Sequence, residues 1–265
     1  ATWPAEEVRG VVVSDRLFSF HAPTETGGAE IDALVFPPDR LAADRAALAE
    51  LERTTTPSTI ASLMVGSAAE TEEVARALER DPLLEGLRRI LVETAWLDQI
   101  ARREIERSKP ELSIVYFEGT DAVGHLFAPY VDPPLAGVSE RDARRFGQVP
   151  RHYFERIDEI LGHYRELAKK QGAVLFLASD HGFRWREGRP RSAASADAAG
   201  AALWHRDEGM YLLAGPGVEH GVDSQPRSVE QVTATLLDLL DLPPGQGLYG
   251  PPLARTRESA GRNVR

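Results

Sequence analysis

Apolar residues recur at helical spacing in several long stretches of the chain. The clearest stretch begins at Pro82, where Leu84, Leu87, Ile90 and Leu91 share one face of a helix. Similar patterns and Ala/Leu-rich composition predict helices over 39–52, 69–80, 82–107, 151–170 and 229–240. The chain is therefore expected to contain a large share of helix.

Continuous apolar runs predict strands between these helices. The two strongest runs are LSIVYF over 112–117 and AVLFLA over 173–178, with a third strand expected over 210–214. Short extended pieces are expected over 11–13 and 32–36. Proline-, charge- and Ala/Ser-rich composition predicts irregular structure between the stronger signals, over 129–150 and 183–202.

The two strongest runs lack alternating polar residues, so both faces of each strand are expected to be covered. Strands that alternate with helices predict an α/β fold with a mostly parallel sheet flanked by helices on both faces. We expect one such domain over 1–253, followed by a polar tail over 254–265. Sites in such sheets form at the carboxyl ends of the strands.

Composition and charge narrow the function classes. The net charge of −10 gives no general help in holding a nucleic-acid backbone, so no nucleic-acid-binding surface is expected. An anionic substrate would need a local positive charge, which a bound metal supplies. The chain has no cysteine, which excludes disulfides, thiolate zinc sites and a cysteine nucleophile. We find no apolar run near about 18 residues and therefore expect no membrane segment.

Two polar clusters follow the two strongest apolar runs. GTDAVGH places Asp121 and His125 in an expected loop after the first run, and SDHG places Asp180 and His181 after the second. Each cluster alone could be a turn aspartate with an exposed histidine. At one sheet edge, however, mixed oxygen and nitrogen donors suit zinc and, less specifically, manganese. Two such ions about 4 Å apart would clamp the attacking and leaving oxygens of a phosphoryl group.

A third cluster, WHRDEG, precedes the third expected strand and contains His205. His205 could complete a three-ligand set with Asp121 and His125, although a histidine at the entrance of a strand also has an ordinary structural role. His220 is its one rival as the last ligand. Tryptophans 185 and 204 could stack on a substrate, but packing within the loop is preferred, and the nearby arginines are interpreted first as a solvated charge run.

The segments GTDAVGH, LASDHGF and WHRDEGMYLLAGPG, in this order, resemble the C-terminal metal-binding half of the alkaline phosphatase superfamily. The type I phosphodiesterase/nucleotide pyrophosphatase group is the most similar branch. The resemblance extends from near residue 2 to about residue 253. It implies two divalent metal ions, zinc or, less specifically, manganese. By position, Asp121, His125 and His205 would bind one ion, and Asp180 and His181 the other.

The resemblance also implies an early aspartate ligand and a Thr or Ser nucleophile, both of which we expect upstream of residue 1. No catalytic nucleophile is assigned within this chain. Asp15 belongs to the context of a later strand, and Thr54, Thr55 and Thr56 lie in a break between helices. The chain also begins without methionine or a signal peptide. We therefore expect an N-terminally truncated fragment of a longer enzyme, from the bacterial cytoplasm or periplasm.

The expected function is metal-dependent hydrolysis of small-molecule phosphoric esters, with phosphodiester or nucleotide-like substrates favoured. The substrate-binding residues and the oligomeric state are not predicted. Two alternatives stay open. The chain could be a non-catalytic metal-binding remnant, or it could belong to a phosphomonoesterase or phosphomutase of the same superfamily.

Overall fold

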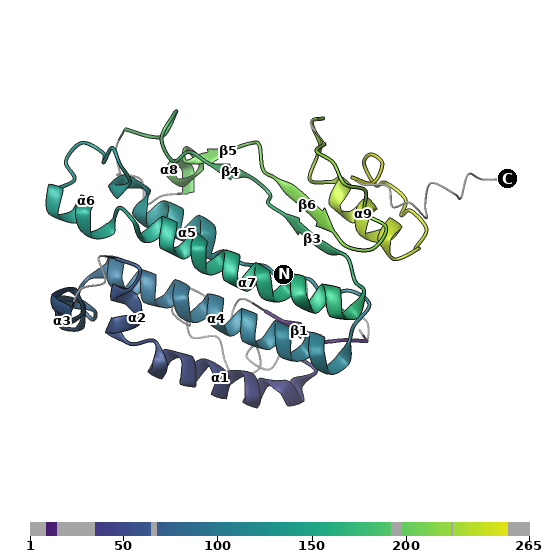
Figure 1. The fold of residues 1–265 in the computed structure, drawn as a ribbon, viewed down its shortest axis with the longest axis horizontal. Helices are drawn as coiled ribbons and strands as arrows, with labels where there is room; N and C mark the ends of the chain where they lie inside the picture. Colours follow the sequence, from purple (N-terminus) through teal and green to yellow (C-terminus); the bar gives the residue numbers. More distant parts are fainter. Residues whose placement is uncertain (1–8, 15–34, 65–67, 192–197, 224, 254–265) are drawn as a thin grey trace. The chain divides into compact units, whose positions relative to one another are not determined.

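The structure is a computed structural model that describes residues 9–14, 35–64, 68–191, 198–223 and 225–253. The chain divides into two compact units, Ala1–Arg156 and Ile157–Arg265. The division falls within helix α7 (Val149–Gln171), which is drawn in Figure 1.

The first unit is mainly helical. Its described elements are the antiparallel strand pair β1 (Val12–Val13) and β2 (Val35–Phe36), the 3-10 helices η3 (Pro38–Arg40) and η4 (Ala128–Tyr130), and the helices α1 (Leu41–Thr54), α2 (Pro57–Ala61), α3 (Ala68–Ala77), α4 (Pro82–Ser108), α5 (Gly119–Phe127) and α6 (Glu140–Phe146), followed by the start of α7. Helices α1 and α5 both pack against α4, the longest helix (Figure 1).

Local chemistry explains where α4 begins and ends. The Asp81 side chain accepts a hydrogen bond from the Leu83 amide at 3.0 Å, and Pro82 occupies the first turn, where its missing amide is not needed. The helix ends at Lys109, whose φ of 45° is left-handed. The predicted helix over 82–107 is thus confirmed, and its apolar face is buried as the spacing indicates.

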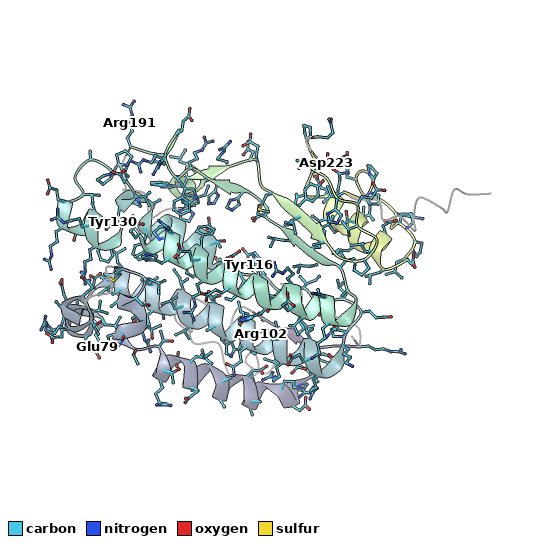
Figure 2. The ribbon with its side chains drawn as sticks, viewed as in Figure 1. Glu79, Arg102, Tyr116, Tyr130, Arg191 and Asp223 are labelled. Carbon is cyan, nitrogen blue, oxygen red and sulfur yellow. The ribbon has the colours of Figure 1, made fainter. Side chains whose placement is uncertain are left out.

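Three segments of the first unit differ from the sequence-based predictions. Residues 112–117 form no helix or strand and belong to none of the sheets in the described part of the chain. Leu112, Ile114 and Tyr116 are 43%, 75% and 63% exposed (Tyr116 is labelled in Figure 2). The structure therefore does not show the predicted buried strand. The loop expected around Asp121 is instead helix α5, and helix α6 interrupts the stretch expected to be irregular.

The second unit contains a long, interrupted antiparallel ribbon. Strand β3 (Leu175–Ala178) pairs with β6 (Tyr211–Ala214), and β4 (Gly182–Phe183) pairs with β5 (His205–Arg206). Between these ladders the Ser179 amide donates to the Met210 carbonyl at 2.9 Å, and the Ser179 Oγ accepts from the Met210 amide at 2.8 Å. We call residues 175–184 and 204–214 together the β3–β6 ribbon.

The remaining predictions for this unit have mixed outcomes. The helices expected over 151–170 and 229–240 are confirmed as α7 and α9 (Gln231–Leu239), and the strands expected over 173–178 and 210–214 as β3 and β6. A short helix, α8 (Ala198–Ala202), lies within the predicted loop over 183–202. The expected tail over 254–265 lies outside the described residues.

The fold class is confirmed only in its coarser form. Helices and strands are both present, but all three sheets of the described residues are two-stranded and antiparallel, so a mostly parallel sheet is not shown. Strand β3 is half-buried to exposed rather than buried on both faces. Among the described helices, none is both long enough and apolar enough to cross a bilayer.

Candidate metal-binding groups

Helix α5 brings together the first two predicted ligands. Asp121 and His125 lie one turn apart, and the His125 Nε2 is 3.3 Å from the Asp121 Oδ2. Their side chains are 30% and 24% exposed. Val123 and Phe127 are buried, so the apolar residues of the helix anchor it while the Asp–His pair stays accessible to solvent.

The sequence allows α5 to approach α4 closely. A Cβ added to Gly86 on α4 would lie 2.9 Å from the Leu126 Cδ1 on α5, which is closer than packed carbon atoms normally come. The missing side chain at Gly86 therefore lets the helix that carries Asp121 and His125 pack closely against α4.

The β3–β6 ribbon brings together the other three predicted ligands. Asp180 and His181 lie where β3 gives way to β4, and His205 begins β5 on the opposite strand. The rings of His181 and His205 are stacked with centroids 3.8 Å apart and planes inclined by 17°. The sequence analysis grouped His205 with Asp121 and His125. Within its own unit, the His205 ring stacks on the His181 ring.

Hydrogen bonds orient Asp180 and His181 locally. The His181 Nδ1 lies 3.1 Å from the Gly182 carbonyl oxygen, and because a carbonyl only accepts, Nδ1 carries the proton in this contact. In a neutral imidazole, Nε2 then retains the lone pair that binds a metal. The Asp180 Oδ1 accepts from the His181 amide at 3.1 Å, while its side chain is 68% exposed.

Two glycines explain how the ribbon narrows at this point. A Cβ on Gly209 would lie 2.5 Å from the Ser179 carbonyl oxygen, and one on Gly182 would overlap the Glu208 carbonyl oxygen. Both glycines therefore permit a close approach of backbones. Gly182 directly follows His181, and Gly209 follows His205 by four residues, so both close approaches lie near the histidines of the ribbon.

Aromatic side chains pack together at the end of the ribbon that carries the histidines. The Phe183 ring lies 4.7 Å from that of Trp185 and 5.8 Å from that of Trp204, which is only 4% exposed. The preferred interpretation of the tryptophans as packing residues is thus confirmed for Trp204. The Arg184 Nε donates to the His205 carbonyl oxygen at 2.9 Å, so Arg184 helps to hold the two strands together.

The alternative residues have other roles or lie elsewhere. His220 is exposed in the segment after β6. The Thr54 Oγ1 donates to the Glu50 carbonyl oxygen at 2.8 Å, which is a role at a helix end. Asp15 lies outside the described residues. Sequence reasoning gave Tyr153, Thr94 and Gly119 no role in the site. The Tyr153 hydroxyl contacts Thr94 and lies beside Gly119, the first residue of α5.

Comparison with known proteins identifies a family. The family model for type I phosphodiesterase / nucleotide pyrophosphatase matches residues 45–239, which include all five predicted ligands. No curated protein and no solved structure matches the chain.

Proposed function

We propose a function from the premise that the chain belongs to the type I phosphodiesterase/nucleotide pyrophosphatase family. It acts on phosphodiester or nucleotide-like small molecules with the help of two divalent metal ions. Family membership itself indicates hydrolysis of phosphoesters. The substrate, the ions and their ligands are the parts that we propose.

The observation that carries this proposal is the grouping of the five predicted ligands. Asp121 and His125 share one helical turn in the first unit, while Asp180, His181 and His205 share one end of the ribbon in the second. Each group offers both a carboxylate and imidazole nitrogens, the mixed donor set that suits zinc. We propose that Asp121, His125 and His205 hold one ion, and that Asp180 and His181 hold the other.

Bound zinc would supply Lewis-acid stabilisation of the phosphoryl oxygens and the local positive charge that an acidic chain lacks. The chain's own residues set the conditions for this chemistry. The Gly182 carbonyl fixes the proton of His181 on Nδ1, and the Arg184–His205 backbone contact keeps the strand that carries His205 in register.

We also propose that residues 112–117 and β3 are neighbouring parallel strands of one sheet. The apolar segment 112–117 exposes Ile114 and Tyr116. We expect another part of the protein to cover it, because its burial removes large apolar surfaces from water. A parallel arrangement would bring Asp121 and Asp180 to the same sheet edge.

Zinc binding tests the ligand assignment. We expect about two tightly bound zinc ions per chain, and we expect Asp180→Ala to lose one of them while retaining the other. Asp158→Ala is the matched control, because Asp158 is exposed on α7 and belongs to neither group. Elemental analysis after dialysis measures the stoichiometry. Equal zinc content in Asp180→Ala and in the unaltered chain would contradict the assignment.

Turnover separates the enzyme from the non-catalytic remnant. Bis(p-nitrophenyl) phosphate is the probe for a phosphodiesterase, and p-nitrophenyl phosphate is the probe for a phosphomonoesterase. Zinc-dependent cleavage of the diester that Asp180→Ala abolishes and Asp158→Ala preserves would support the proposed activity. Zinc binding without cleavage is expected of this chain if its nucleophile lies upstream of residue 1. The same result in a protein that includes the upstream segment would favour a metal-binding remnant.

A further inference from the structure

Tyr153 on α7 lies buried beside the start of α5, the helix that carries Asp121 and His125. Its side chain is completely buried, and its Oη is 2.7 Å from the Thr94 Oγ1 on α4. The hydroxyl also faces the first residue of α5. A Cβ added to Gly119 would overlap the Tyr153 Oη and would lie 2.9 Å from the Cζ.

The direction of the hydrogen bonds follows from their acceptors. The Thr94 Oγ1 is 2.7 Å from the Ile90 carbonyl oxygen, which can only accept, so Thr94 donates its single proton there. Tyr153 must then donate to Thr94. Burial raises the pKa of Tyr153 to about 12, so the hydroxyl keeps its proton at neutral pH. The phenol is thereby tied to the backbone of α4 through Thr94.

Two neighbouring side chains restrict the start of α5. The Tyr153 hydroxyl overlaps the position of a Cβ added to Gly119, and the Ile90 Cγ2 lies 3.0 Å from the same position. Asp121 follows Gly119 by two residues within the same helix, and His125 follows by a further turn. A displacement at the first residue therefore moves both polar side chains, because a short helix shifts as a rigid element.

We propose that Tyr153, held by Thr94, is a positioning residue for the Asp121–His125 pair, and that Gly119 is the small residue that permits its hydroxyl to stand there. This inference rests on the proposed function in one respect, namely that the Asp121–His125 pair contributes to zinc binding. If Tyr153 is only a core residue, its hydroxyl has no effect on zinc affinity beyond any general loss of stability.

Four variants of the full chain separate these possibilities. Gly119→Ala introduces the overlap, and Tyr153→Phe removes the hydroxyl while keeping the ring. The double variant removes the worst part of the overlap, although the 2.9 Å approach to the Cζ remains. Gly162→Ala is the matched control, because Gly162 lies in a helix and an added Cβ there meets nothing within 4 Å.

Zinc affinity, measured by competition with a fluorescent chelator, is the main readout. Gly119→Ala should weaken binding at the Asp121–His125 group by about 10–100-fold, and Tyr153→Phe by about fivefold. The double variant should bind at least about threefold more tightly than Gly119→Ala, while Gly162→Ala should stay within about twofold of the unaltered chain. Unchanged affinity in Gly119→Ala, or no recovery in the double variant, would overturn the inference.

Amide hydrogen exchange in α5, measured without zinc, keeps the inference testable when zinc gives no answer. We expect faster exchange in Gly119→Ala and slower exchange again in the double variant. If the unaltered chain binds no zinc, the proposed function fails and this exchange pattern alone decides the positioning role. If Gly119→Ala does not fold, restored folding in the double variant supports the inference. If neither variant folds, amide exchange of α5 in Tyr153→Phe decides: faster exchange supports the inference, and unchanged exchange overturns it.

Discussion

The ion pair between Asp44 and Arg103 gives an asymmetric prediction about stability. The Asp44 side chain on α1 is fully buried, and its Oδ1 lies 2.6 Å from the Arg103 Nη2 on α4, whereas the Arg103 side chain is 35% exposed. Removing the arginine leaves a buried carboxylate without its cation. Removing the aspartate leaves a cation that can turn toward water or keep its 3.0 Å contact with Glu104.

These differences set the expected magnitudes. Arg103→Ala should lower the free energy of unfolding by about 3–5 kcal/mol, the range for a buried ion pair that loses one partner. Asp44→Ala should lower it by only about 1–2 kcal/mol, because the remaining charge stays partly hydrated. Asp39→Ala is the control and should stay within about 0.5 kcal/mol, since the Asp39 side chain is 76% exposed and 3.9 Å from its partner Arg40.

Urea unfolding followed by circular dichroism measures the midpoints, and amide exchange in α4 assigns each transition to the first unit. Equal losses for Asp44→Ala and Arg103→Ala, or a larger loss for the aspartate, would refute the reasoning from burial. A changed denaturant slope would indicate that the substitution altered the extent of unfolding rather than its free energy.

Two further predictions concern the second unit. Hydrogen bonds, chiefly from Arg227, lower the pKa of Asp223 from 3.8 to about 2, so this contact stabilises the loop after β6 above about pH 4 and is lost as the pH falls toward 2 (Asp223 is labelled in Figure 2). Amide exchange in that loop should show this acid transition, and Asp223→Asn should abolish it. Gly209→Ala should destabilise the β3–β6 ribbon by about 1–3 kcal/mol through its overlap with Ser179, with faster amide exchange in β3, whereas Gly221→Ala, which meets nothing within 4 Å, should leave the ribbon unchanged.

The helices could be predicted from the sequence because their signals are local. Asp81 and Pro82 mark the start of α4, and the spacing of Leu84 and Leu87 defines its buried face. Sheet topology could not be predicted in the same way, because an apolar run does not say which strand lies beside it. The β3–β6 pairing joins segments that β4, α8 and β5 separate in the sequence, and no residue in β3 distinguishes an antiparallel partner from a parallel one.

For the candidate site too, the sequence predicted the residue types but not the contacts that position them. The residue types at positions 121, 125, 180, 181 and 205 indicated metal chemistry, and the family match includes them all. The contacts that place them were beyond sequence reasoning, because they join distant positions. Thr94 and Tyr153 are 59 residues apart in the sequence, and neither carries a signal of its own. The loop expected around Asp121 is a helix, in which Gly119 packs against Tyr153 and Ile90 and Gly124 is buried, so neither glycine marks a turn.

The apolar segment over 112–117 provides the sharpest test of the proposed sheet. Ile114 is 75% exposed, so a charged substitution there should change stability by less than about 0.5 kcal/mol if the segment stays open to water. If the segment is instead a strand beside β3, Ile114→Lys removes a buried side chain worth about 1.5–3 kcal/mol and introduces a charge into the sheet face.

We expect the larger loss, because the segment carries apolar side chains on both faces and such strands are stable only when they are covered. Val222→Lys is the matched control: Val222 is 96% exposed and should tolerate lysine in either case. Urea midpoints for the two variants make the comparison. Equal midpoints, with improved solubility of Ile114→Lys as the only effect, would mean that the segment is an exposed apolar edge, and Asp121 and Asp180 would then need another route to a common metal site.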